Sequence, residues 1–360
     1  MSCTQKNTFI VKTTPNTILT ILSLIFLTAF FVGCDTSNNN GGGEPIVEPE
    51  PEVFVPEFDK DSAYQFVQKQ VDFGPRVPET AEHKACSEWI KTTLESYGWE
   101  VQFQEAEIQG FENKPMMIRN IIATYNPEAS ERVLLCAHWD TRRMADQDTE
   151  RKDEPILGAD DGGSGVGVLM ELARVVSNNP LNAGIEIVFF DAEDQGESGS
   201  PRPAEQTWCL GAQYWSRNQH KMKVQPRFGI LLDMVGRSGA QFPKEGVSLN
   251  RAGQIVNIVW NQALKLGLNE LFVNENDDQL IDDHVYVNDI GGIKTIDIIN
   301  RPVLRNSDGQ VVMNRAENRP ERHFGDHWHT HKDDMKIIDR YVLESVGDVL
   351  LHVLYKEVAE

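Results

Sequence analysis

The sequence predicts an α/β protein, built as a three-layer α/β/α sandwich around a central mixed, mostly parallel sheet. Continuous apolar runs, typical of strands buried on both faces, occur at 133–137, 185–190, 228–232 and 295–299. Segments with helical periodicity lie between them, at about 163–177, 206–219 and 251–266. Buried strands that alternate with amphipathic helices are the pattern of a sheet covered by helices on both faces.

The flanking elements fit the same fold. Helical patterns precede the first buried strand at about 61–72 and 80–97, joined by a rigid loop at 73–78 that carries two prolines. Alternating residues at 101–104 and 117–125 predict an antiparallel pair of strands. A last amphipathic helix is expected at about 336–357.

The N-terminal segment has the features of a targeting signal. Lys6 and Lys12 precede an apolar run at 18–32, which is short for a membrane span of about 20 residues. The run ends at Phe31-Val-Gly-Cys34, which resembles a bacterial lipobox and would make Cys34 a lipidated first residue. The alternative is a plain signal peptide with an unrelated cysteine.

The predicted organisation is a lipoprotein signal peptide at 1–33, a tether at 34–58 and one catalytic α/β domain at 59–360. The tether is rich in Asn, Gly, Glu and Pro, a composition that cannot bury a core. We expect a lipid anchor in the bacterial cell envelope, with the protein facing the periplasm or lying on the cell surface, and we expect a monomer.

The composition excludes some classes of function. The chain has 360 residues, 40% hydrophobic and 25% charged, with a formal net charge of -21. Such acidity disfavours nucleic-acid binding, because phosphates would be repelled. The five cysteines show no spacing typical of a disulfide scaffold or a thiolate zinc site, and Cys86 and Cys136 are expected to be core thiols.

Polar residues gather where predicted strands end. They are His138 and Asp140 after the first buried strand, Asp191, Glu193 and Asp194 after the second, and Asp233 after the third. Open α/β sheets build their sites at the carboxyl ends of strands, so these side chains are expected to meet. Because Glu193 and Asp194 are adjacent, their side chains should diverge, one towards a metal and the other towards substrate.

Two further segments supply candidate ligands. Asp161 lies in a glycine-rich turn at 158–167 that opens a helix, where it could cap the helix or bind a metal, while Asp160 is expected to be solvated. His327, His329 and His331 alternate, so in extended backbone they would share one face. Histidines and carboxylates are the ligand types of a zinc site, and a carboxylate left off the metal can transfer protons.

A further polar segment is less informative from its residues alone. Asp282-Asp283-His284 falls in a polar stretch at 274–288, for which a solvated turn is the expectation.

The order of these motifs resembles the zinc-dependent aminopeptidase superfamily. The shared motifs are His138-x-Asp140, Gly158-Ala-x-Asp161, Asp191-x-Glu193-Asp194, Leu231-Leu-Asp233 and Trp328-His-Thr330. More narrowly, the chain resembles the glutaminyl cyclase family in its animal-like and bacterial form. That narrower likeness depends on Phe73-Gly-Pro-Arg-Val-Pro78, Asp282-Asp-His284 and Trp328-His-Thr330, and it covers nearly all of 60–360.

The resemblance implies one zinc ion per chain. Its ligands would be Asp161, Asp194 and His329, with Glu193 as the general acid and base. Many relatives have Glu where Asp194 stands; the shorter side chain is still a competent ligand but would shift the metal.

The resemblance also assigns roles around the metal. Asp233 and Asp282 would share a carboxylate network with Glu193. Trp328 would form a wall of the substrate pocket, with His284 beside it. Trp208 is a candidate for a pocket tryptophan that animal cyclases carry after the paired acids.

The implied activity is that of a zinc-dependent glutaminyl-peptide cyclotransferase, which converts the N-terminal glutamine of peptides or proteins to pyroglutamate and releases ammonia. One alternative is a two-zinc aminopeptidase whose ligands would be His138, Asp161, Asp194, Asp233 and His329. Another is an inert surface lipoprotein that uses the fold as a binding module.

Overall fold

The computed structural model describes residues 53–358. The predicted signal peptide at 1–33, Cys34 and the first part of the tether lie outside these described residues. Within 53–358, no helix is both long and apolar enough to cross a membrane. The last tether residues are part of the domain surface, and Phe58 is buried in the main core.

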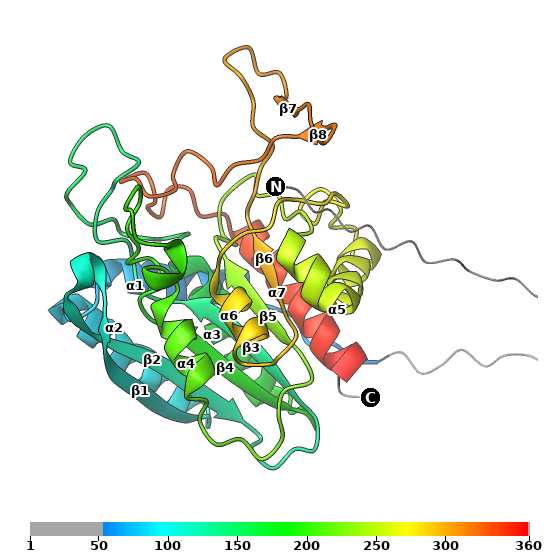
Figure 1. Ribbon diagram of the computed structural model, residues 1–360. Helices are drawn as coiled ribbons and strands as arrows, with labels where there is room; N and C mark the ends of the chain where they lie inside the picture. Colours follow the sequence, from blue (N-terminus) through cyan, green and yellow to red (C-terminus); the bar gives the residue numbers. More distant parts are fainter. Residues whose placement is uncertain (1–52, 359–360) are drawn as a thin grey trace, which may run out of the picture. The chain divides into compact units, whose positions relative to one another are not determined.

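A six-stranded mixed sheet forms the centre of the domain (Figure 1). Its strands, in chain order, are β1 (Glu100–Gln109), β2 (Pro115–Tyr125), β3 (Arg132–His138), β4 (Gly184–Phe190), β5 (Gly229–Asp233) and β6 (Thr295–Ile299). The spatial order is β1-β2-β4-β3-β5-β6, in which β4, β3, β5 and β6 run parallel. β1 pairs antiparallel with β2, and β2 antiparallel with β4. The predicted mixed, mostly parallel sheet is confirmed.

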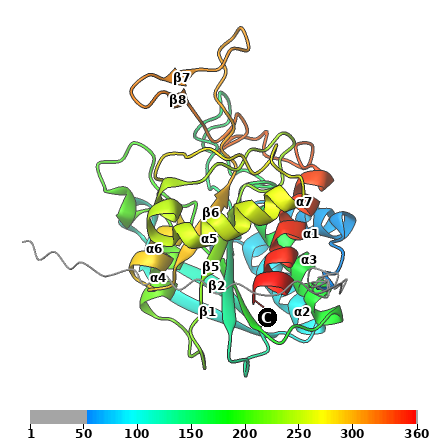
Figure 2. The ribbon, with the colours of Figure 1, turned by 90° about the vertical axis from the view of Figure 1, so that its right-hand side faces the viewer.

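Helices cover both faces of the sheet, as Figure 2 shows with the sheet nearly edge-on. On one face lie α1 (Lys60–Phe73), α2 (Ala81–Ser96), α3 (Gly163–Asn178), α5 (Gly246–Lys265) and α7 (Arg340–Val353). On the other lie α4 (Leu210–Arg217) and α6 (Asp283–Asp289), around a smaller core that includes Trp215 and Val287. Every residue of β3, β4, β5 and β6 is buried, so the continuous apolar runs do mark strands covered on both faces.

Several elements differ from the prediction. α4 is shorter than expected because a 3₁₀ turn, Ala204–Gln206, precedes it, and a π turn, Leu354–Val358, follows α7. α6 was not predicted, since its seven residues are too few to show helical periodicity. A short hairpin of β7 (Met313–Asn314) and β8 (Arg319–Pro320) projects from the domain (Figure 1).

Side chains at the helix starts explain several boundaries. The Asp59 carboxylate accepts the N–H groups of Asp61 and Ser62 at the start of α1, and Asp339 accepts that of Tyr341 at the start of α7. The three described cysteines are buried and free, which confirms the expectation for Cys86 and Cys136.

Candidate metal site and pocket

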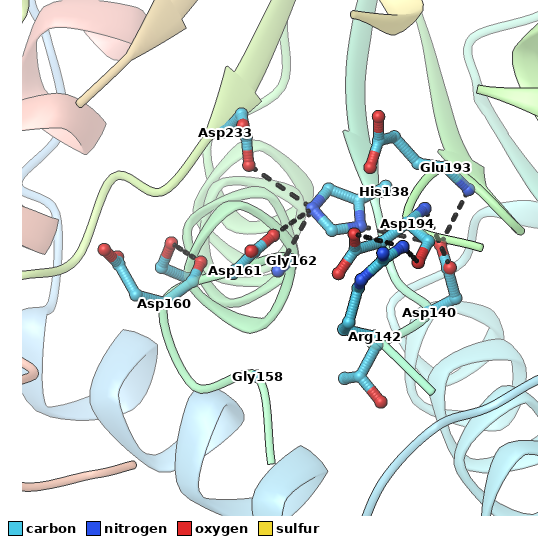
Figure 3. A network of polar contacts seen from close by, with 12 residues as sticks. His138, Asp140, Arg142, Gly158, Asp160, Asp161, Gly162, Glu193, Asp194 and Asp233 are labelled. Atoms are coloured by element: carbon cyan, nitrogen blue, oxygen red, sulfur yellow. Dashed lines mark hydrogen bonds and ion pairs between the residues drawn. The ribbon is translucent and has the colours of Figure 1, made fainter. Parts of the chain in front are cut away.

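The candidate site lies at the carboxyl ends of the parallel strands. His138 is the last residue of β3, Asp233 is the last of β5, and Glu193 and Asp194 follow β4 by a few residues. Because neighbouring strands end at the same edge of the sheet, these side chains converge there, as Figure 3 shows.

The turn that carries the two adjacent acids is fixed by Asp140. The backbone N–H groups of Glu193 and Asp194 donate to the two oxygens of the Asp140 carboxylate, at 3.1 and 3.2 Å. The Gln195 side-chain amide donates to Asp140 Oδ2 at 2.9 Å. This anchoring directs the Glu193 and Asp194 side chains differently, as the sequence predicted (Figure 3).

The glycine-rich turn places Asp161 beside His138. Asp333, 0% exposed, accepts the backbone N–H groups of Asp160 and Asp161 at 2.7 and 3.1 Å. At Gly162, which has φ of 22°, a Cβ would lie 2.8 Å from His138 Nδ1. The turn can approach β3 this closely only because glycine occupies that position.

Asp161, Asp194 and His329 form a buried group that could hold a metal ion. Their potential ligand atoms all lie within 4.8 Å of one another. His329 Nε2 is 3.0 Å from Asp194 Oδ1 and 3.9 Å from Asp161 Oδ2. Neither oxygen of Asp194, nor Oδ2 of Asp161, has a hydrogen-bond donor. Buried carboxylate oxygens without donors are costly, and a cation between them and the imidazole would satisfy all three groups.

A second group of the same kind shares Asp161. His138 Nε2 lies 3.1 Å from Asp161 Oδ1 and 3.3 Å from Asp233 Oδ1. The backbone N–H of Gly162 also points at this nitrogen, at 3.1 Å. The residues of the second metal position of the aminopeptidase alternative are therefore also close together.

Two acids in the pocket, Glu193 and Asp233, hold their protons more firmly than usual. Burial raises the pKa of Glu193 well above its usual range, and the charges of Asp282, Asp194 and Asp283 add to this. Burial, with a contribution from Asp282, raises the pKa of Asp233 to about 8 against the opposing contact with His138. Glu193 and Asp282 offer oxygens within 4.8 Å of each other. Proton sharing among closely spaced carboxyl groups is typical of sites that perform acid–base chemistry.

A cavity of about 190 Å³ opens over these residues. Its polar lining consists of Asp161, Glu193, Asp194, Asp233, Asp282 and His329, and its apolar lining of Ala204, Trp208, Met234, Leu280, Ile281, Ile299, Phe324 and Trp328. Typical small-molecule pockets measure about 300–1,000 Å³, so this one suits a single terminal residue rather than a long peptide.

Two tryptophans flank the imidazole of His329. The Trp328 ring stacks on it at a centroid distance of 3.7 Å, and the Trp208 ring lies nearly parallel to it at 5.8 Å. Trp208 is held over Gly196, where a Cβ would come within 1.9 Å of the indole. Both residues therefore line the cavity beside a candidate ligand.

Three interpretations from the sequence are wrong in detail. His284 does not line the cavity: it is 0% exposed, and its Nε2 lies 3.1 Å from Glu245 Oε2, because α6 begins at Asp283 and carries the ring away from the pocket. The solvated turn expected at 282–284 is for the same reason a buried helix start, with Asp282 as its N-cap. Asp160 is fully buried and accepts from the Gly236 N–H at 2.7 Å.

The three alternating histidines do not share one face. His329 adopts φ of 56° within a series of turns, so the backbone is not extended there. His327 Nε2 lies 3.0 Å from Asp160 Oδ2, and His331 Nδ1 lies 2.9 Å from Asp148 Oδ2. His329 is the one of the three that lies next to Asp161 and Asp194.

The sequence placed Asp140 at this site without a role, and the structure shows that it fixes the turn of the paired acids. Two further site residues were not identified from the sequence. Asp146 lies 3.2 Å from His329 Nδ1, and the Cys209 thiol lies 3.2 Å from Glu193 Oε1. These last two stand in loops whose path only the folded structure determines.

Comparison with known proteins links this geometry to a family. A profile of peptidase family M28 matches residues 120–354. The chain is similar to the crystal structure of Porphyromonas gingivalis glutaminyl cyclase, with 47% identity, a TM-score of 0.75, and coverage of 84% of this chain and 99% of that one. It is also similar to a Zn-dependent exopeptidase from Parabacteroides distasonis, with 42% identity, a TM-score of 0.77, and coverage of 84% and 100%.

Curated sequences show a more distant likeness. Glutaminyl-peptide cyclotransferase of Drosophila melanogaster is 27% identical over 175 residues, which are 47% of this chain and 46% of that protein. The match thus spans about half the length of that relative.

Proposed function

The chain belongs to peptidase family M28, and we propose that it is a zinc-dependent glutaminyl-peptide cyclotransferase. It converts an N-terminal glutamine to pyroglutamate and releases ammonia. One observation carries this proposal. The Asp161–Asp194–His329 group and Glu193, an acid outside that group, line the same cavity of about 190 Å³, which tryptophan side chains also line. The 47% identity to a glutaminyl cyclase over 99% of its length favours cyclisation over other reactions of such a site.

Asp161, Asp194 and His329 would hold the zinc ion. Zinc, when bound, supplies Lewis acidity that polarises the γ-carbonyl of the substrate glutamine. The donor types, two carboxylates and one imidazole, are those of catalytic zinc sites with an open position.

Glu193 carries the proton transfers. The substrate's own α-amine attacks the γ-carbonyl carbon, so that a C–N bond forms and closes a five-membered lactam. Glu193 accepts a proton from this amine and delivers it to the departing amide nitrogen, which leaves as ammonia. Because the nucleophile is tethered to its target, proximity supplies much of the rate, and no activated water is needed.

The remaining pocket residues hold the substrate. Asp233 and Asp282 line the cavity together with Glu193 and offer oxygen atoms that accept hydrogen bonds from the terminal amine. Trp328 and Trp208 offer flat apolar faces to the side-chain methylenes of the glutamine. The small cavity keeps the chain folded back on itself, as cyclisation requires.

A two-zinc aminopeptidase is the second candidate. The observation in its favour is the second group, His138, Asp161 and Asp233, whose spacing would also suit a metal ion. The similarity to a Zn-dependent exopeptidase points the same way. In that enzyme Glu193 would instead activate water for hydrolysis of the first peptide bond.

A paired assay separates the candidates. Zinc-loaded protein is incubated with the amide of glutamine and, separately, with that of leucine, and both ammonia and free amino acid are measured. The cyclase releases ammonia from the glutamine compound alone and no free amino acid, whereas the aminopeptidase releases a free amino acid together with ammonia. An inert binding protein does neither, and a chelator-treated sample controls for zinc dependence.

The place of action is a further part of the proposal. We propose that the mature protein is a monomer attached to the bacterial envelope through a lipid on Cys34, facing the periplasm or the cell surface. The apolar run and lipobox-like residues before Cys34 support it. Cell fractionation tests it: Cys34→Ala should leave the membrane fraction, and unchanged membrane abundance would contradict the anchor.

A further inference from the structure

Two aspartates of one loop reach two histidines of the neighbouring turn. Asp146 Oδ1 lies 3.2 Å from His329 Nδ1, and Asp148 Oδ2 lies 2.9 Å from His331 Nδ1. The two aspartates are two residues apart in the sequence, and so are the two histidines. Only the first pair involves a residue of the candidate metal group.

Asp146 is fixed from the opposite side by Arg142. The guanidinium donates to the Asp146 carboxylate from Nε at 3.2 Å and from Nη2 at 2.9 Å. Arg142 is 0% exposed, and its Nη1 donates to the carbonyl oxygens of Asp194 and Gly196 at 2.9 and 2.8 Å. The same arginine thus links the loop of Asp146 to the segment that carries Asp194.

Two tryptophan rings stack on the His329 imidazole, whereas its Nδ1 atom makes no regular hydrogen bond. Trp328 and Trp208 flank the ring, and Nε2 points at Asp194. Nδ1 has no hydrogen bond of regular geometry, and Asp146 is the carboxylate within ion-pair distance. An imidazole that binds a metal through Nε2 carries its proton on Nδ1, and a carboxylate at that N–H fixes both tautomer and ring orientation.

We propose that Asp146 is a positioning residue of the zinc site: it accepts the Nδ1–H of His329 and holds Nε2 towards the metal. Arg142 keeps the Asp146 carboxylate in place and ties it to the segment of the second ligand, Asp194. The inference rests on the zinc site of the proposed function, and not on which reaction the site performs.

The pair of Asp148 and His331 provides a matched control. It has the same residue types and a similar separation, and each of its side chains is 18% exposed. His331 is in none of the groups that could hold a metal. Asp146→Asn and Asp148→Asn therefore make the same chemical change at equivalent positions, one on a candidate ligand and one beside it.

The test is an affinity measurement on the full domain. Zinc-free wild-type, Asp146→Asn and Asp148→Asn proteins are titrated with Zn²⁺ in competition with a chromophoric chelator, and melting temperatures are recorded with and without zinc. Asp146→Asn should bind zinc about 10–100-fold more weakly, as is typical for loss of a carboxylate behind a histidine ligand. Asp148→Asn should stay within about threefold of wild type, because this change touches no ligand.

Further measurements distinguish a role of Asp146 in positioning His329 from a general effect on the stability of its loop. The zinc-free melting temperature of Asp146→Asn should stay near that of wild type, while the rise on adding zinc shrinks. Asp146→Glu, which keeps the charge, should recover part of the lost affinity. Zinc affinity of Asp146→Asn within twofold of wild type, or an equal loss in Asp148→Asn, would overturn the proposal. If wild-type protein binds no zinc, the proposed function fails instead.

Discussion

The Sγ atom of Cys209 lies 3.2 Å from Oε1 of Glu193. Cys209 is fully buried and stands immediately before α4. Its backbone adopts the left-handed conformation, with φ of 55°. Its backbone N–H donates to the Glu193 carbonyl at 3.0 Å, so the two residues are joined at both backbone and side chain. A thiol is a weak donor, and here it orients the carboxylate that we assign to proton transfer.

We expect Cys209→Ala to lower kcat about fivefold, because it removes a hydrogen bond worth about 1 kcal/mol from Glu193. Cys209→Ser keeps a donor and should stay within about twofold of wild type. Steady-state kinetics with thermal melts checks this; equal kcat for both variants would show that the thiol only fills space.

Glu193→Gln should keep the fold and bound zinc but lose turnover by about 10²–10⁴-fold, because the amide cannot cycle a proton. The exposed acid Glu205, in the turn before α4, supplies the control: Glu205→Gln should retain wild-type kcat. Near-normal kcat in Glu193→Gln would remove Glu193 from the mechanism. Loss of zinc would instead make it a ligand.

Elemental analysis of purified protein should give one zinc per chain. His329→Ala should lose that zinc because it removes a ligand, whereas His331→Ala and His138→Asn should retain it. Two zinc ions per chain, both needed for activity and one lost in His138→Asn, would identify the aminopeptidase arrangement.

The Glu245 carboxylate connects the start of α5 with α6 and with the segment before α6. Its carboxylate accepts the N–H groups of Val247 and Ser248 at the start of α5, and that of Leu280 before α6, at 2.7–2.9 Å. Its Oε2 also lies 3.1 Å from His284 Nε2. Burial opposes its charge, but these contacts outweigh that effect and lower the pKa of Glu245 to about 2.

A lowered pKa makes part of the folding stability depend on pH. Because the folded value is about 2 against an ordinary 4.5, the stabilisation is complete above pH 4.5 and is lost as pH falls towards 2. The difference corresponds to about 3 kcal/mol.

Glu245→Gln should therefore reduce the free energy of unfolding by about 2–3 kcal/mol at pH 7, with the gap to wild type narrowing below pH 4.5. Denaturant unfolding at several pH values measures this, with Glu270→Gln, at an exposed acid, as the control. A gap that stays constant down to pH 3 would show that the charge of Glu245 is not responsible.

The fold was predictable because its core strands are short, mostly apolar and buried along their full length. Polar residues at or shortly after the ends of β3 and β4, such as His138 and Asp194, were predicted to meet at one edge of the sheet. The folded chain does bring them together. Strand order and direction follow from tertiary pairing, but the alternation with helices was enough to indicate a mostly parallel sheet.

The remaining contacts of the site depend on turns and loops, whose sequences show no helical or strand periodicity. His284 was expected beside the substrate, but the short α6 buries it against Glu245. Asp146 and Cys209 approach the site only because their loops fold back across it, one to His329 and one to Glu193. Such contacts between residues far apart in the chain cannot be inferred from local sequence patterns.

Mass spectrometry of peptide products tests the central claim most directly. Two peptides that differ only in the first residue, Gln or Leu, are incubated together with the zinc-loaded protein, with Glu193→Gln protein as the control. The Gln peptide should lose one ammonia and remain a single chain, while the Leu peptide stays unchanged and the control shows little conversion. Release of a free N-terminal amino acid, with no pyroglutamyl product, would contradict the assignment as a cyclase.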